Sequence, residues 1–248
     1  MTFRKPILFT LMTAALAACV SAPPPIEKAP ASESAQLNLR LGAGYLQQGH
    51  METAQEKFEK ALEYDDSLPE AHNAIAVLYE ETGRPALAER HYGRAVELQP
   101  SYALARMNYG RVLCENGKLE DGEAQYLKAA SIDGGSPAEA YTGAAICALE
   151  IPDKEKAREY LNKAMAAGPS APRALYQMAD MSYAEGDYAQ AKSYLSRYHA
   201  RAGFSPQSLW LAMSIEQALG DEAARQVYAD ILLSRFGESN EARQFRSQ

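Results

Sequence analysis

A three-residue motif recurs along this chain with a period close to 34 residues. It consists of a small residue, an aromatic residue or leucine four positions later, and usually an alanine three positions after that. Its six copies are Ala54/Phe58/Ala61, Ala88/Tyr92/Ala95, Gly122/Tyr126/Ala129, Ala157/Leu161/Ala164, Ala191/Leu195/Tyr198 and Ala224/Tyr228/Ile231. Such a period predicts a stack of similar units, each of which buries its apolar face against its neighbours. Scaffolds of this kind hold partners and rarely catalyse reactions.

Turn residues form a second marker with the same spacing. They are Gly49, Gly83, Gly117, Pro152, Gly186 and Gly220. Each follows a stretch of helical periodicity. Glycine adopts the left-handed conformation that ends a helix, and proline ends one because it lacks a backbone donor. The markers therefore predict two helices per unit, joined by a tight turn.

Interior small residues, turn residues and terminal breakers such as Pro100 keep one phase over roughly residues 35 to 236. This combination resembles the tetratricopeptide repeat. The resemblance implies an all-α fold, a right-handed superhelical solenoid of six helical hairpins, with a C-terminal cap or tail over residues 237–248. The repeats are expected at about 35–68, 69–102, 103–137, 138–171, 172–205 and 206–236. Gly122 departs from the pattern because it stands where the repeat usually has alanine.

Residues 1–18 have the composition of an export signal. Arg4 and Lys5 form a cationic start, and the apolar stretch over 7–18 is too short to span a bilayer comfortably. The segment ends in Leu16-Ala17-Ala18-Cys19, which resembles the bacterial lipobox. That resemblance implies acyl chains on Cys19, which would anchor the protein stably.

Val20, rather than aspartate, follows Cys19. In Gram-negative lipoproteins this favours the outer membrane, with the folded part on its periplasmic face. An ordinary secretory signal, with Cys19 as an incidental thiol, is the alternative. Residues 19–34 then form a tether with four prolines, a composition that favours extended backbone and a reach of about 50 Å.

In tetratricopeptide stacks the concave face is lined by first-helix positions that do not pack inside the hairpin. In this phase they are Leu39, Ala43, Leu46, Asn73, Val77, Glu80, Met107 and Arg111. An apolar patch of Leu39, Leu46 and Val77 beside the amide of Asn73 predicts a groove for an extended or helical peptide. The alternative is that Leu39 and Leu46 only cover the N-terminal end of the stack.

Cys114 and Cys147 occupy nearly equivalent places late in neighbouring first helices. Acylation of Cys19 would leave them as an even pair in an oxidising compartment. Adjacent helix axes are about 8–10 Å apart, so that only facing side chains can form a disulfide. Both a disulfide and two buried thiols are compatible with the sequence.

The chemistry expected of an enzyme has little support. The formal net charge of −7 argues against nucleic acid as a partner. The four histidines show no i, i+4 pair and no cysteine cluster beside them, so neither a metal nor a cofactor is expected. We expect no catalytic residues and no small-molecule substrate.

The order of lipobox, proline-rich tether and six repeats resembles the pilotin family of type IV pilus biogenesis lipoproteins, the PilF/PilW type. The local match lies in Leu41-Gly42-Ala43-Gly44-Tyr45-Leu46-Gln47-Gln48-Gly49 and in Met107-Asn108-Tyr109-Gly110. The resemblance implies binding to the outer-membrane secretin subunit and help with its localisation and multimer assembly. The alternatives are another periplasmic adaptor lipoprotein, for outer-membrane protein assembly or cell-wall hydrolases, and a peptidoglycan-binding or enzymatic lipoprotein.

Overall fold

The computed structural model describes residues 31–150, 153–168 and 171–247. The export signal 1–18, Cys19, the prolines of the tether and the turn residue Pro152 lie outside these ranges. In the described part the chain forms thirteen helices and no strand. The helices are α1 (Ala31–Gln47), α2 (Met51–Tyr64), α3 (Pro69–Glu81), α4 (Pro85–Leu98), α5 (Ala103–Glu115), α6 (Leu119–Ala130), α7 (Pro137–Glu150), α8 (Lys154–Ala167), α9 (Pro172–Ala184), α10 (Tyr188–Ala202), α11 (Pro206–Leu219), α12 (Glu222–Arg235) and α13 (Asn240–Arg246).

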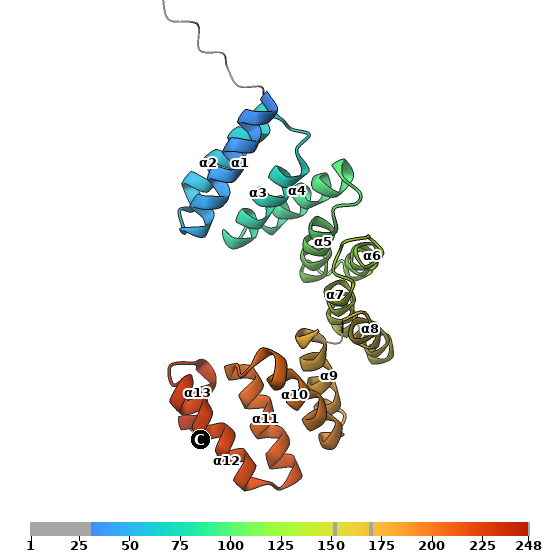
Figure 1. Ribbon diagram of the computed structural model, residues 1–248, viewed down its shortest axis with the longest axis vertical. Helices are drawn as coiled ribbons and strands as arrows, with labels where there is room; N and C mark the ends of the chain where they lie inside the picture. The colour runs from blue at the N-terminus through green and yellow to red at the C-terminus, as the bar shows by residue number, and fades with distance from the viewer. Residues whose placement is uncertain (1–30, 151–152, 169–170, 248) are drawn as a thin grey trace, which may run out of the picture.

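Consecutive helices pair into hairpins, from α1 with α2 to α11 with α12, and the hairpins stack side by side. Figure 1 shows a curved stack, with α5 and α7 on the inner side of the bend and α6 and α8 on the outer side. The expected all-helical repeat solenoid is thereby confirmed. None of the helices in the described ranges is long and apolar enough to cross a membrane.

The periodic motif lies where the helices of each hairpin cross. In the second repeat Ala88, Tyr92 and Ala95 are all fully buried: Ala88 and Tyr92 pack with residues of α3, and Ala95 packs in a cluster with Ala105 of α5. A small residue lets the two backbones approach, and the large ring fills the space farther along the crossing. The motif is therefore the internal core of each unit, as its spacing predicts.

The sixth copy of the motif is only partly buried, because no complete repeat follows it. The short helix α13 covers this end of the stack instead. Its Ala242 is fully buried and packs with Leu209, Ala229 and Leu232 of the last hairpin. A covered end is what a repeat stack needs, since each unit otherwise leaves one apolar face bare.

The turns have the backbone conformation that the glycine markers predict. Gly49, Gly83, Gly117, Gly186 and Gly220 all have φ between +70° and +83°. The second helix of each of the last three repeats also begins with an aspartate whose side chain accepts a backbone N–H bond: Asp153, Asp187 and Asp221. Each such cap stabilises its helix by about 1 kcal/mol.

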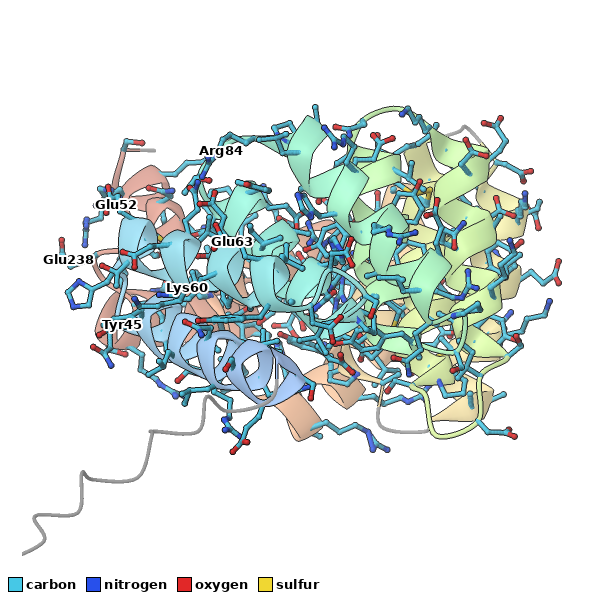
Figure 2. The ribbon with its side chains drawn as sticks, turned by 90° about the horizontal axis from the view of Figure 1, so that it is seen from above. Tyr45, Glu52, Lys60, Glu63, Arg84 and Glu238 are labelled. Carbon is cyan, nitrogen blue, oxygen red and sulfur yellow. A yellow bond between two sulfur atoms is a disulfide. The ribbon has the colours of Figure 1, made fainter. Side chains whose placement is uncertain are left out.

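The first helix begins earlier than the repeat pattern indicates. It starts at Ala31, whereas the tether was expected to extend to residue 34. The boundary differs because the repeat phase marks only the packed positions, whereas residues 31–34 contain no proline or glycine and place Glu33 in the first turn, where an acidic side chain is favourable. Figure 2 looks down on this end, where α1 and α2 form the surface and Lys60 and Glu63 of α2 are labelled.

Candidate functional site

The apolar residues predicted to form a groove lie at the edge of the N-terminal core. Leu39, Ala43, Leu46 and Val77 are all half-buried, and they pack against the cluster that contains Phe58, Ile75 and Tyr79. Leu39 also contacts a second small cluster, with Ala61 and Leu68. Each of the four side chains thus has one side in the core and one side toward solvent.

Asn73 of the predicted groove is bound within the stack. Its side chain is only 8% exposed, and its amide oxygen accepts a hydrogen bond of 3.0 Å from Nδ2 of Asn108 on α5. The sequence pattern could not show this contact because the two residues belong to different repeats. The Asn73 oxygen therefore links α3 to α5.

Glu80 and Arg111, the charged residues of the predicted groove, are bound to each other. Arg111 contacts both carboxylate oxygens of Glu80 at 2.7 Å, and the Tyr92 hydroxyl donates to the same carboxylate. Burial and this hydrogen bond raise the pKa of Tyr92, while the pairing raises the pKa of Arg111. Bidentate pairing of this kind is strong and directional. Glu80, Tyr92 and Arg111 therefore tie α3, α4 and α5 together.

Cys114 and Cys147 form a disulfide that joins α5 to α7, with a Cα–Cα distance of 5.7 Å. Of the two alternatives that the sequence allows, the structure has the bonded pair. The disulfide lies in the wall of a hollow of about 420 Å³ that Arg111, Ile146 and Arg173 also line. Met107, the remaining predicted groove residue, is half-buried and packs against the core of the middle repeats.

Two more hollows continue from the first toward the C-terminal end. One, of about 280 Å³, shares Arg173 with the first and is lined by Tyr176, Tyr198 and Gln207. The next, of about 480 Å³, shares Tyr176 and Gln207 and extends to Trp210. The three hollows thus adjoin one another through shared residues, and the two C-terminal ones have aromatic walls.

The residues of the C-terminal hollow are not among the predicted groove residues, although the repeat phase contains a signal for them. Tyr176, Asp180 and Tyr183 follow Asn73, Val77 and Glu80 at the same phase, three repeats later. The prediction applied that phase to the first three repeats only. Extending it to the fifth repeat would have found all three.

Two histidines that are distant in the sequence meet on the other side of the second repeat. Nδ1 of His72 lies 2.9 Å from Nδ1 of His91, and Nε2 of His72 lies 3.0 Å from the backbone oxygen of Asp66. A carbonyl only accepts, so His72 carries its proton on Nε2 and accepts from His91. Burial lowers the pKa of both residues, that of His91 to about 4. Within the described ranges no three His, Cys, Asp or Glu side chains are grouped so as to hold a metal ion.

Comparison with known proteins identifies close relatives of this chain. The tetratricopeptide repeat model matches residues 39–92 and 74–137. The type IV pilus assembly protein PilF of Pseudomonas aeruginosa is 31% identical over 171 residues, which cover 66% of this chain and 67% of that protein.

Two solved structures are also similar over most of the chain. That of Pseudomonas aeruginosa PilF has a TM-score of 0.73 at 27% identity, covering 88% of this chain and 98% of the other. That of PilW, described as a widely conserved type IV pilus biogenesis factor, has a TM-score of 0.76 at 25% identity, covering 85% of this chain and 97% of the other. On this sequence and structural similarity, the chain belongs to the PilF/PilW family of tetratricopeptide-repeat proteins of type IV pilus biogenesis.

Proposed function

We propose that this protein is a pilotin: an outer-membrane lipoprotein that binds the type IV pilus secretin subunit and promotes its localisation and assembly into multimers. The observation that supports it most is membership of a pilus biogenesis family together with a curved stack whose inner face is partly apolar. The role is one of binding without catalysis.

The secretin would be held at the inner face of the first repeats. Leu39, Leu46 and Val77 expose apolar surface there, beside side chains that are fixed by the core. The Glu80–Arg111 pair closes one side of this patch and keeps α3 and α5 in register. Such a preformed apolar surface, rimmed by bound polar groups, suits a helical or extended peptide.

The lipid anchor would hold the repeat stack at the outer membrane. Acyl chains on Cys19 would tether the stack to the inner leaflet of the outer membrane, and captured secretin subunits would be concentrated near one another. A raised effective concentration accelerates assembly without any new contact. This part of the proposal rests on the lipobox-like sequence alone.

Deleting the gene and blotting for heat-resistant secretin multimers tests the proposal. We expect the multimers to fall severalfold and to return when the wild-type gene is supplied. A Cys19→Ala variant, at matched protein levels, should restore them incompletely and leave them outside the outer membrane. Unchanged multimers in the deletion strain would exclude the pilotin role and favour another adaptor function.

A further inference from the structure

A second feature of the inner face stands apart from the apolar patch of the first repeats. The hollow of about 480 Å³ at the C-terminal end is lined by residues of α9, α11 and α13, and α11 contacts both of the other helices. Tyr176, Tyr183 and Trp210 form aromatic walls, and Asp180 and Glu241 are two carboxylates that also line it. Its volume falls in the range of pockets that enclose a ligand.

The negative charge of the two carboxylates is not balanced by a basic side chain in the lining of this hollow. No Lys, Arg or His lines it, and neither Asp180 nor Glu241 has a hydrogen bond or ion pair with any residue of the described part of the chain. Burial raises the pKa of the Tyr176 hydroxyl, and the negative charges of both carboxylates, which line the same hollow, raise it further. Although Asp180 reaches solvent, partial loss of water also raises the pKa of its own carboxyl.

Three acids that are buried or half-buried elsewhere in this stack each pair with a cation. Glu80 is paired with Arg111, Glu123 with Lys156 at 2.7 Å, and Glu216 with Lys192 at 2.8 Å. The C-terminal hollow departs from this pattern because its two carboxylates face a cavity instead of a basic side chain. Asp180 is exposed and Glu241 is half-buried, so a positive group that entered the cavity would meet two carboxylates that pair with no cation of the described residues.

The aromatic walls fit the same kind of ligand. A guanidinium or ammonium group is attracted to the face of a tryptophan or tyrosine ring, and more strongly where water is excluded. The methylene groups of a long basic side chain also pack well against aromatic rings. Carboxylates beside aromatic walls therefore select lysine or arginine over neutral side chains.

We propose that this hollow binds a lysine or arginine side chain of an extended segment in a partner protein. The neighbouring hollow of about 280 Å³, which shares Tyr176 and Gln207, receives the residues on one side of the basic residue. The carboxylates disfavour anionic lipid and nucleic acid at this position. The inference is independent of the proposed function, since it concerns other repeats and does not require the secretin to be the partner.

The fluorescence of this protein can be used to detect binding in the hollow, because Trp210 is the sole tryptophan of the chain. We would titrate the purified full chain with a capped peptide of one arginine among leucines and prolines, and follow Trp210 emission. The same peptide with glutamine for arginine is the probe control. The arginine peptide should give a saturable change, and the glutamine peptide should bind at least about tenfold more weakly.

An Asp180→Asn/Glu241→Gln double variant should lose the same factor in affinity for the arginine peptide. The matched control is Glu52→Gln/Glu63→Gln, which removes two exposed carboxylates of α2 at the other end of the stack, both labelled in Figure 2. Unfolding curves would show that both variants are folded. The proposal is overturned if no saturable change occurs, if the glutamine peptide binds equally, or if the Asp180/Glu241 variant binds like wild type. Equal binding of free arginine amide would overturn the assignment to a peptide segment.

Discussion

Reducing the disulfide between Cys114 and Cys147 is expected to lower the free energy of unfolding by about 2–4 kcal/mol. The bond joins α5 to α7 across a sequence separation of 33 residues, and it restricts the unfolded chain accordingly. In a repeat stack each hairpin is held mainly by its neighbours, so that a covalent link between two repeats stabilises the middle of the array.

Urea unfolding with and without a thiol reductant measures this effect. The midpoint of the wild-type protein should fall on reduction. A Cys114→Ala/Cys147→Ala double variant should unfold near the lower midpoint under both conditions, which separates the bond from other effects of the reductant. Identical midpoints for the oxidised and reduced wild-type protein would contradict the prediction.

A Gly122→Ala substitution is expected to destabilise the protein by about 1–3 kcal/mol, although alanine is the usual residue at this point of the repeat. A methyl group at Gly122 would lie 2.3 Å from Sγ of Cys114 and 2.7 Å from the backbone oxygen of Gly110. Neither neighbour moves easily, since one belongs to the disulfide and the other to the backbone of α5.

Gly44→Ala is the matched control, because a methyl group at Gly44 meets no atom within 4 Å. Gly44 lies inside α1, so alanine there should stabilise the helix by up to about 1 kcal/mol. The two substitutions should therefore shift the urea midpoint in opposite directions. A shift of the same sign and size for both would show that the contact at Gly122 is not the cause.

Gly122 also shows how far the sequence determines the fold. The period of 34 predicts the hairpins, because each unit repeats the same local crossing and the same turn. The period presents Gly122 as a departure, because the glycine is required by the close approach of two α5 atoms: the backbone oxygen of Gly110 and the sulfur of Cys114, which is bonded to the next repeat. Sequence periodicity describes what units share, and this contact is particular to one pair of units.

In the candidate site, too, some features can be predicted from the repeat phase and others depend on contacts between particular units. The half-buried state of Leu39 and Val77 follows from helix phase alone, and the phase extended to the fifth repeat gives Tyr176. The binding of Asn73 to Asn108 could not be predicted, because it depends on the angle between successive repeats. The meeting of His72 and His91 likewise depends on how two helices of one hairpin cross.

The most direct test of secretin capture by the first repeats is the affinity of a Val77→Asp variant for the purified periplasmic region of the secretin. Val77 is half-buried on α3, where a carboxylate would disrupt the apolar surface without replacing a fully buried side chain. The control is Val227→Asp, which makes the same change on α12 at a side chain that is 57% exposed. We predict at least about a tenfold loss of affinity for Val77→Asp, with its unfolding midpoint close to that of the control, and no loss for Val227→Asp. Undiminished binding by Val77→Asp, or a loss matched by an equal loss of stability, would contradict the account.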